Sequence, residues 1–101
     1  MNKRTSLFLM ANLGAEVSRI VSFKKGGDVV NTKESLARAQ RILEDIRQLP
    51  DMKKRLEEVS LLKQVITDIA QVNPVLSISS EHLTSYFQPF ALRLMNINEP
   101  L

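Results

Sequence analysis

The sequence predicts an all-α protein, an antiparallel helical bundle of three to four helices in one domain that covers residues 1–101. The segment 31–73 contains no glycine and a single proline, Pro50. Its apolar residues recur at intervals of three and four, which places them on one face of a helix. The one short alternating apolar segment, 75–79, has no second strand to pair with, so no sheet is expected. A chain of 101 residues is long enough to bury a core without disulfides or metals.

We expect the first helix over residues 3–23. Its apolar positions follow helical spacing and are Leu9, Met10, Leu13, Val17, Ile20 and Val21. Two lysines and the pair Gly26–Gly27 come next. This order is typical of a helix C-terminus, because cations suit the carbonyl end and glycine accepts a left-handed turn.

One face of this first helix consists of small residues, namely Ala11, Gly14, Ala15 and Ser18. Glycine inside a helix costs about 1 kcal/mol relative to alanine, so Gly14 calls for an explanation. A residue without a side chain allows another backbone to approach closely. Either a neighbouring helix of the same chain crosses here, or the face serves self-association.

The second helix is predicted over 32–49 and the third over 51–72. Asn31 is the expected N-cap of the second helix, since Glu34 stands three positions further on, as in a capping box. Pro50 disfavours helical geometry in the residue before it and suits the first turn of a new helix. The short break favours an antiparallel hairpin over one long kinked helix.

The third helix should end at Asn73–Pro74, and we expect residues 75–79 to cross the bundle as an extended strap. Ser79 or Ser80 would cap a fourth helix over 80–95. The apolar face of that helix would contain Leu83, Tyr86, Phe87, Phe90 and Leu94. Pro89 falls inside it, which predicts a kink or a split at that position.

The net charge of +3 is unevenly distributed along the chain. Residues 1–27 hold five bases and one acid, a net charge of +4, while residues 28–50 and 51–72 each balance four bases with four acids. Several acids and bases in the second and third helices stand four positions apart, a spacing that supports exposed helices. These predicted pairs are Glu34–Arg38, Arg41–Asp45, Asp51–Arg55, Lys53–Glu57 and Lys54–Glu58.

The residues available for catalysis are few. The chain has no cysteine, which excludes disulfides, thiolate metal sites and cysteine nucleophiles. His82 is the only histidine, and no partner for it can be named from the sequence. The glycines near Lys24 and Lys25 lack the spacing of a phosphate-binding loop. We therefore predict no enzyme activity, no catalytic residue, no cofactor and no metal.

The leading functional hypothesis is a non-enzymatic helical module for protein–protein interaction, self-associating as a homodimer. The candidate interaction face combines the small residues of the first helix with the aromatic cluster of the fourth: Ala11, Gly14, Ala15, Ser18, Tyr86, Phe87 and Phe90. Those residues could instead fill an internal core.

The alternative is a nucleic-acid-associated domain that uses the basic residues of the first helix and of the start of the third. These candidates are Lys3, Arg4, Lys24, Lys25, Lys53, Lys54 and Arg55. A nucleic-acid binder usually has a denser basic face. No apolar run reaches the length of a membrane span. No signal peptide is recognised, so we expect a soluble cytoplasmic protein with no membrane partner.

Overall fold

The computed structural model of the chain describes residues 3–76 and 79–98. Over these residues the elements are α-helices and one 3₁₀-helix, with no strand: α1 (Lys3–Lys25), α2 (Val29–Arg47), η1 (Pro50–Arg55), α3 (Leu56–Ile69) and α4 (Ser80–Asn98). The predicted all-α helical bundle is confirmed.

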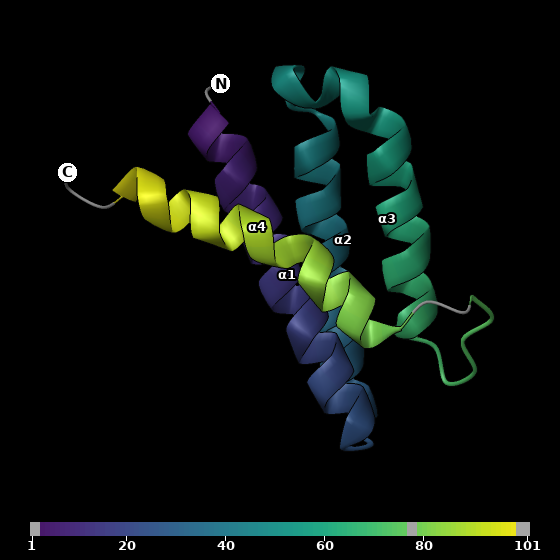
Figure 1. Cartoon of the computed structure of the whole chain (residues 1–101). Coiled ribbons are helices and arrows are strands. Elements are labelled where there is room, and N and C mark those ends of the chain that lie inside the picture. The colour runs from purple at the N-terminus through teal and green to yellow at the C-terminus, as the bar shows by residue number, and fades with distance from the viewer. Residues whose placement is uncertain (1–2, 77–78, 99–101) are drawn as a thin grey trace.

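The helices are arranged around α1. Figure 1 shows α1 and α2 running antiparallel, α3 returning antiparallel beside α2, and α4 crossing α1 at an angle. Helix α1 packs against both α2 and α4, whereas α3 packs chiefly against α2. Helix α1 is therefore central in the bundle, and α3 is peripheral.

The core consists of the apolar side chains that the helical spacing places on inward faces. Its fully or nearly buried members are Leu7, Met10, Leu13, Val17, Ile20, Ala39, Leu43, Ile46, Leu49, Met52, Val59, Leu62, Val65, Ile66, Ile69, Leu83, Phe87 and Phe90. Burying an aliphatic or aromatic side chain of this size contributes roughly 1.5–3 kcal/mol, so this cluster supplies the main stabilisation of the fold.

The turn between α1 and α2 ends the first helix as predicted but starts the second one earlier. Gly27 has a φ of 73°, in the left-handed region, and the Asp28 N–H donates to the Phe23 carbonyl at 2.9 Å. These features define a glycine-terminated helix end. The Asp28 carboxylate then accepts the Asn31 N–H at 3.1 Å. Asp28, and not Asn31, is thus the N-cap, and α2 begins at Val29.

The connection after α2 follows the proline prediction, but the third helix differs in form and length. Leu49, which precedes the proline, has an extended backbone with φ −72° and ψ 133°. The chain then makes the 3₁₀-helix η1 before α3, and α3 ends at Ile69 where the prediction extended to residue 72.

The loop after α3 does not cross the bundle as a packed strap. Val72 and Val75 are 84% and 82% exposed. The buried Asp68 carboxylate accepts the backbone N–H groups of Val75 at 2.9 Å and Leu76 at 3.0 Å, which holds this part of the loop near the end of α3. Residues 77–78 of the expected strap lie outside the described residues.

Helix α4 is continuous from Ser80 to Asn98 with Pro89 inside it, so the chain is not split there. Its ribbon bends partway along in Figure 1, in keeping with a helix that contains a proline. The Ser79 hydroxyl accepts the His82 N–H at 3.0 Å and caps the helix as predicted. None of the helices in the described part of the chain has the length and apolar character needed to cross a bilayer.

Candidate interaction surfaces

The crossing of α1 and α4 uses the inner part of the predicted interaction face. A Cβ atom added at Gly14 would lie 2.6 Å from the Phe87 Cβ and 2.9 Å from its Cγ, closer than real side chains approach. Phe87 and Phe90 are buried at this contact. Of the two interpretations of the small residues, the close helix crossing within one chain is therefore observed. This crossing explains why position 14 is a glycine, since a side chain there would collide with Phe87.

The outer part of the same face remains accessible. Ala15 and Ser18 are exposed, while Ala11 and Tyr86 are partly buried. The structure therefore divides the predicted set between internal packing and surface.

Tyr86 joins α4 to the start of α3 through a charged pair. The Arg55 Nε and Nη2 donate to the two oxygens of Glu58 at 2.8 and 2.7 Å, and the Tyr86 hydroxyl donates to Glu58 Oε1. The Arg55 guanidinium carbon also lies 5.9 Å from the centre of the Phe90 ring, within cation–π range.

This network shifts the acid–base properties of its members. The hydrogen bonds from Arg55 lower the pKa of Glu58, because they stabilise the carboxylate. Burial raises the pKa of Tyr86, and its hydrogen bond to the Glu58 carboxylate raises that pKa further. Tyr86 therefore acts as a neutral donor that links two helices.

The charged pairs of the described residues differ from those predicted from four-residue spacing. They are Arg19–Glu16, Arg38–Glu16, Arg47–Glu44 and Arg55–Glu58. Arg38 was expected to pair with Glu34, but it reaches the buried Glu16 on α1 at 3.1 Å. A carboxylate facing a neighbouring helix needs a partner there, so tertiary packing overrides the local pairing.

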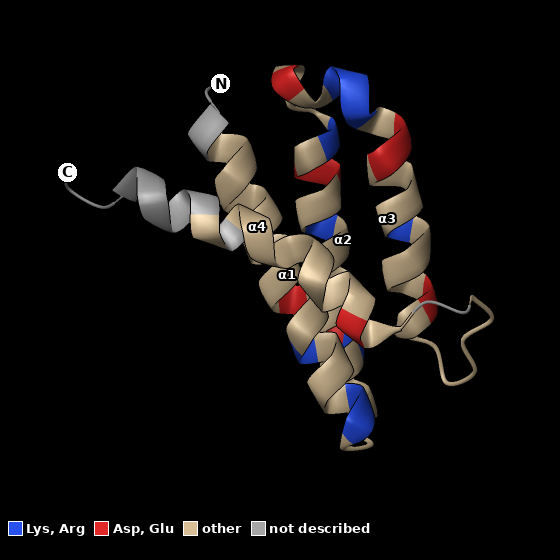
Figure 2. Cartoon of the chain, viewed as in Figure 1, with Lys and Arg blue, Asp and Glu red and all other residues tan. Residues whose placement is uncertain are grey.

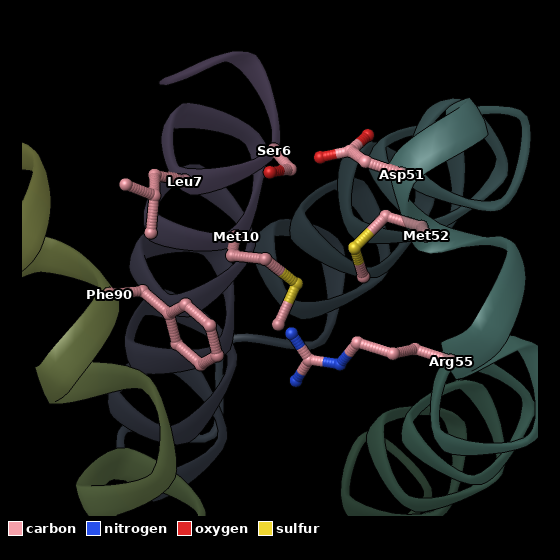
Figure 3. Close-up of a pocket in the computed structure, with 7 residues that line it drawn as sticks. All are labelled: Ser6, Leu7, Met10, Asp51, Met52, Arg55 and Phe90. Atoms are coloured by element: carbon pink, nitrogen blue, oxygen red, sulfur yellow. The ribbon is translucent and has the colours of Figure 1, made fainter. Parts of the chain in front are cut away.

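A hollow of about 370 Å³ lies between α1, η1 and α4 beside this network (Figure 3). Its lining residues are Ser6, Leu7, Met10, Asp51, Met52, Arg55 and Phe90. In Figure 3 the Arg55 side chain points toward Met10 and the Phe90 ring. The lining is mainly apolar, but it also contains the Ser6 hydroxyl, the Asp51 carboxylate and the Arg55 guanidinium, which is bound by Glu58.

The structure does not gather the candidate nucleic-acid contacts onto one face. The end of α1, with Lys24 and Lys25, and the 3₁₀-helix η1, with Lys53–Arg55, lie at opposite ends of the molecule (Figure 2). The Lys24 ammonium donates to the Ile69 carbonyl at 2.7 Å. The side chains of Lys3 and Arg4 lie outside the described residues.

Two surfaces of the described chain each bring several exposed aliphatic side chains together. The first, which we name the α3 face, lies on the outer side of the peripheral helix. It is a shallow depression of about 400 Å³ lined by Leu56, Glu57, Ser60, Leu61 and Gln64. Leu61 is 58% exposed. Helical spacing predicts a buried stripe of Met52, Leu56, Val59, Leu62, Ile66 and Ile69. Leu61 lies off this stripe, whereas Leu56 belongs to it and is nevertheless 38% exposed, so the prediction is wrong for Leu56.

The second surface, which we name the valine–lysine end, brings together three chain segments. They are the end of α1, the start of α2 and the loop after α3. Its members are Lys24, Lys25, Val29, Val30, Lys33, Val72 and Val75. A groove of about 600 Å³ lies between Val29 and Val72. No sequence pattern marks this surface, because its segments are far apart in the chain.

His82 is exposed at the start of α4. Within the described residues no three metal-binding side chains lie close enough to hold an ion. Comparison of the chain with models of protein families, with curated proteins and with solved structures finds no match.

Proposed function

We propose that the chain is a non-enzymatic helical module for protein–protein interaction, and that it self-associates as a homodimer through the α3 face. The observation that carries this proposal is the pair of exposed leucines, Leu56 and Leu61, on a helix that α2 covers on one side. Exposed aliphatic groups gathered on one helix face favour burial against a partner. We place the module in the cytoplasm.

A second copy of the chain is the partner that fits the charge of this surface. Glu57 is the one charged side chain that lines the α3 face, and Lys63 lines a separate hollow between α2 and α3. Two identical surfaces of such low charge can meet about a two-fold axis when the contact is centred on the leucines and leaves the two Glu57 side chains at its rim. The two α3 helices would then bury their leucines against each other.

The oligomeric state tests this proposal directly. Sedimentation equilibrium at high micromolar concentration should show a dimer for the unmodified chain. Leu61→Glu should weaken the dimer at least about tenfold, because it places an unpaired charge in an apolar contact. Leu92→Glu is the matched control, since Leu92 on α4 is 52% exposed and lies outside the α3 face. A strict monomer, or a dimer unaffected by Leu61→Glu, would disprove the proposal.

Cross-linking provides a second measurement of the same contact. Because the chain has no cysteine, a Ser60→Cys variant carries a unique thiol in the middle of the α3 face. A two-fold contact through this face should give rapid disulfide-linked dimers under mild oxidation. A cysteine at Ser18 on α1, which is also exposed, should cross-link only slowly.

A further inference from the structure

The valine–lysine end combines protruding aliphatic side chains with positive charge. Val72 and Val75 are among the most exposed apolar residues described, and Val29 and Val30 at the start of α2 are 57% and 66% exposed. Val29 and Val72 line the same groove. Lys24 and Lys33 line the groove next to Val29 and Val72. Lys24 and Lys25 line the adjoining hollow with Pro74.

The protruding loop is held in place by polar contacts. Asp68 binds two backbone N–H groups of the loop, and Lys24 binds the last carbonyl of α3. Residues 70–76 contain no charged side chain. The valines are therefore presented outward on a braced, uncharged loop.

The positive charge of this end disfavours a second copy of the chain as partner and favours an anionic lipid surface. Asp28 is the one acid that lines either hollow, and its carboxylate is bound by Asn31 at the helix start. A second copy docked on this end would bring the lysines of two chains together, which is unfavourable. A nucleic acid would use the lysines but not the valines. An anionic lipid surface uses both, because aliphatic groups enter the interface while lysines meet the headgroups.

We propose that the valine–lysine end docks the protein on anionic lipid bilayers, with Val72 and Val75 inserted at the interface and Lys25 and Lys33 on the headgroups. This inference goes beyond the proposed self-association and uses different residues. It departs from the sequence-based expectation of no membrane partner, because the lysines and valines come together only in the folded chain.

Vesicle flotation tests the inference with the full chain. The protein should float with vesicles of equal parts phosphatidylcholine and phosphatidylserine, and far less with phosphatidylcholine alone. Val72→Ser combined with Val75→Ser should reduce binding more than about tenfold, since burial of each valine is lost. These residues are exposed, so the melting temperature should not change. Equal binding to both vesicles, no binding to either, or normal binding of the double variant would overturn the inference.

Charge variants separate the lysines of this end from basic residues elsewhere. Each of Lys25→Glu and Lys33→Glu should weaken binding to the anionic vesicles about fivefold or more, because one lysine near such a surface contributes roughly that factor. Lys53→Glu, at the opposite end of the molecule, is the matched control and should have little effect. An equal loss in all three variants would show a general charge effect and would overturn the assignment to this end.

Fluorescence reports which residue enters the lipid. The chain has no tryptophan, so Val75→Trp gives a single reporter at the loop and Leu61→Trp gives one on the α3 face. The emission of Val75→Trp should shift to shorter wavelength with anionic vesicles, and that of Leu61→Trp should not. A shift at Leu61 without one at Val75 would place the α3 face on the membrane and refute the proposal.

Discussion

The α3 face and the valine–lysine end both expose aliphatic side chains, yet they suit different partners. The α3 face is a shallow depression on one helix, in a segment whose acids and bases balance. The valine–lysine end is assembled from three segments, protrudes at a loop and carries lysines. The difference shows that exposed apolar area alone does not define a partner. The shape and the charge around the apolar area define the partner. Lysines repel the lysines of a second copy, but they are attracted to an anionic surface.

The largest effect on stability is expected from disrupting the crossing of α1 and α4. Gly14→Leu should destabilise the fold by about 1–3 kcal/mol, because the added side chain overlaps the Phe87 ring. Thermal or denaturant unfolding measures the loss. Ala15→Leu is the matched control at the exposed neighbouring position and should be nearly neutral. If Gly14→Leu melts higher than the unmodified chain, α4 does not cross α1 at Gly14.

An intermediate effect should separate the two surfaces. Asp68→Ala removes the acceptor of two loop N–H groups, and because Val75 and Leu76 are exposed and water can replace that acceptor, we expect a loss of about 1 kcal/mol. The loop should loosen, so vesicle binding should fall while the dimer measured by sedimentation persists. Hydrogen exchange of the Val75 and Leu76 amides reports the loosening. Loss of the dimer together with vesicle binding would mean that the two surfaces are coupled.

The smallest effect concerns the link between α3 and α4. The pKa of Glu58 is lowered from its usual 4.5, so its contribution to stability is present above that value and is lost as pH falls through the lower folded-state pKa. The pair is more than a third exposed, and we expect only about 0.2–1 kcal/mol. Glu58→Gln should therefore show a flatter loss of stability in acid than the unmodified chain. Parallel pH curves for the two proteins would contradict this role.

Sequence patterns predicted the helices well where neighbours in the chain decide the outcome. The end of α1 at its two glycines, the break at Pro50 and the cap at Ser79 are local, and all three are confirmed. The sequence-based prediction of Asn31 as the N-cap of α2 is wrong, because Asp28 occupies that position. That error is also local, since two good capping residues stand three positions apart and the glycine turn selects the earlier one.

The sequence by itself determined that the chain is helical, where its helices break and which faces are apolar, because these properties depend on residues three or four positions apart. Only the tertiary structure decided that α4 crosses α1 at Gly14, that Arg38 pairs with Glu16, and that Val29 lies beside Val72. Such contacts join residues remote in the chain, and their positions follow from how the helices pack together. No local pattern encodes that packing.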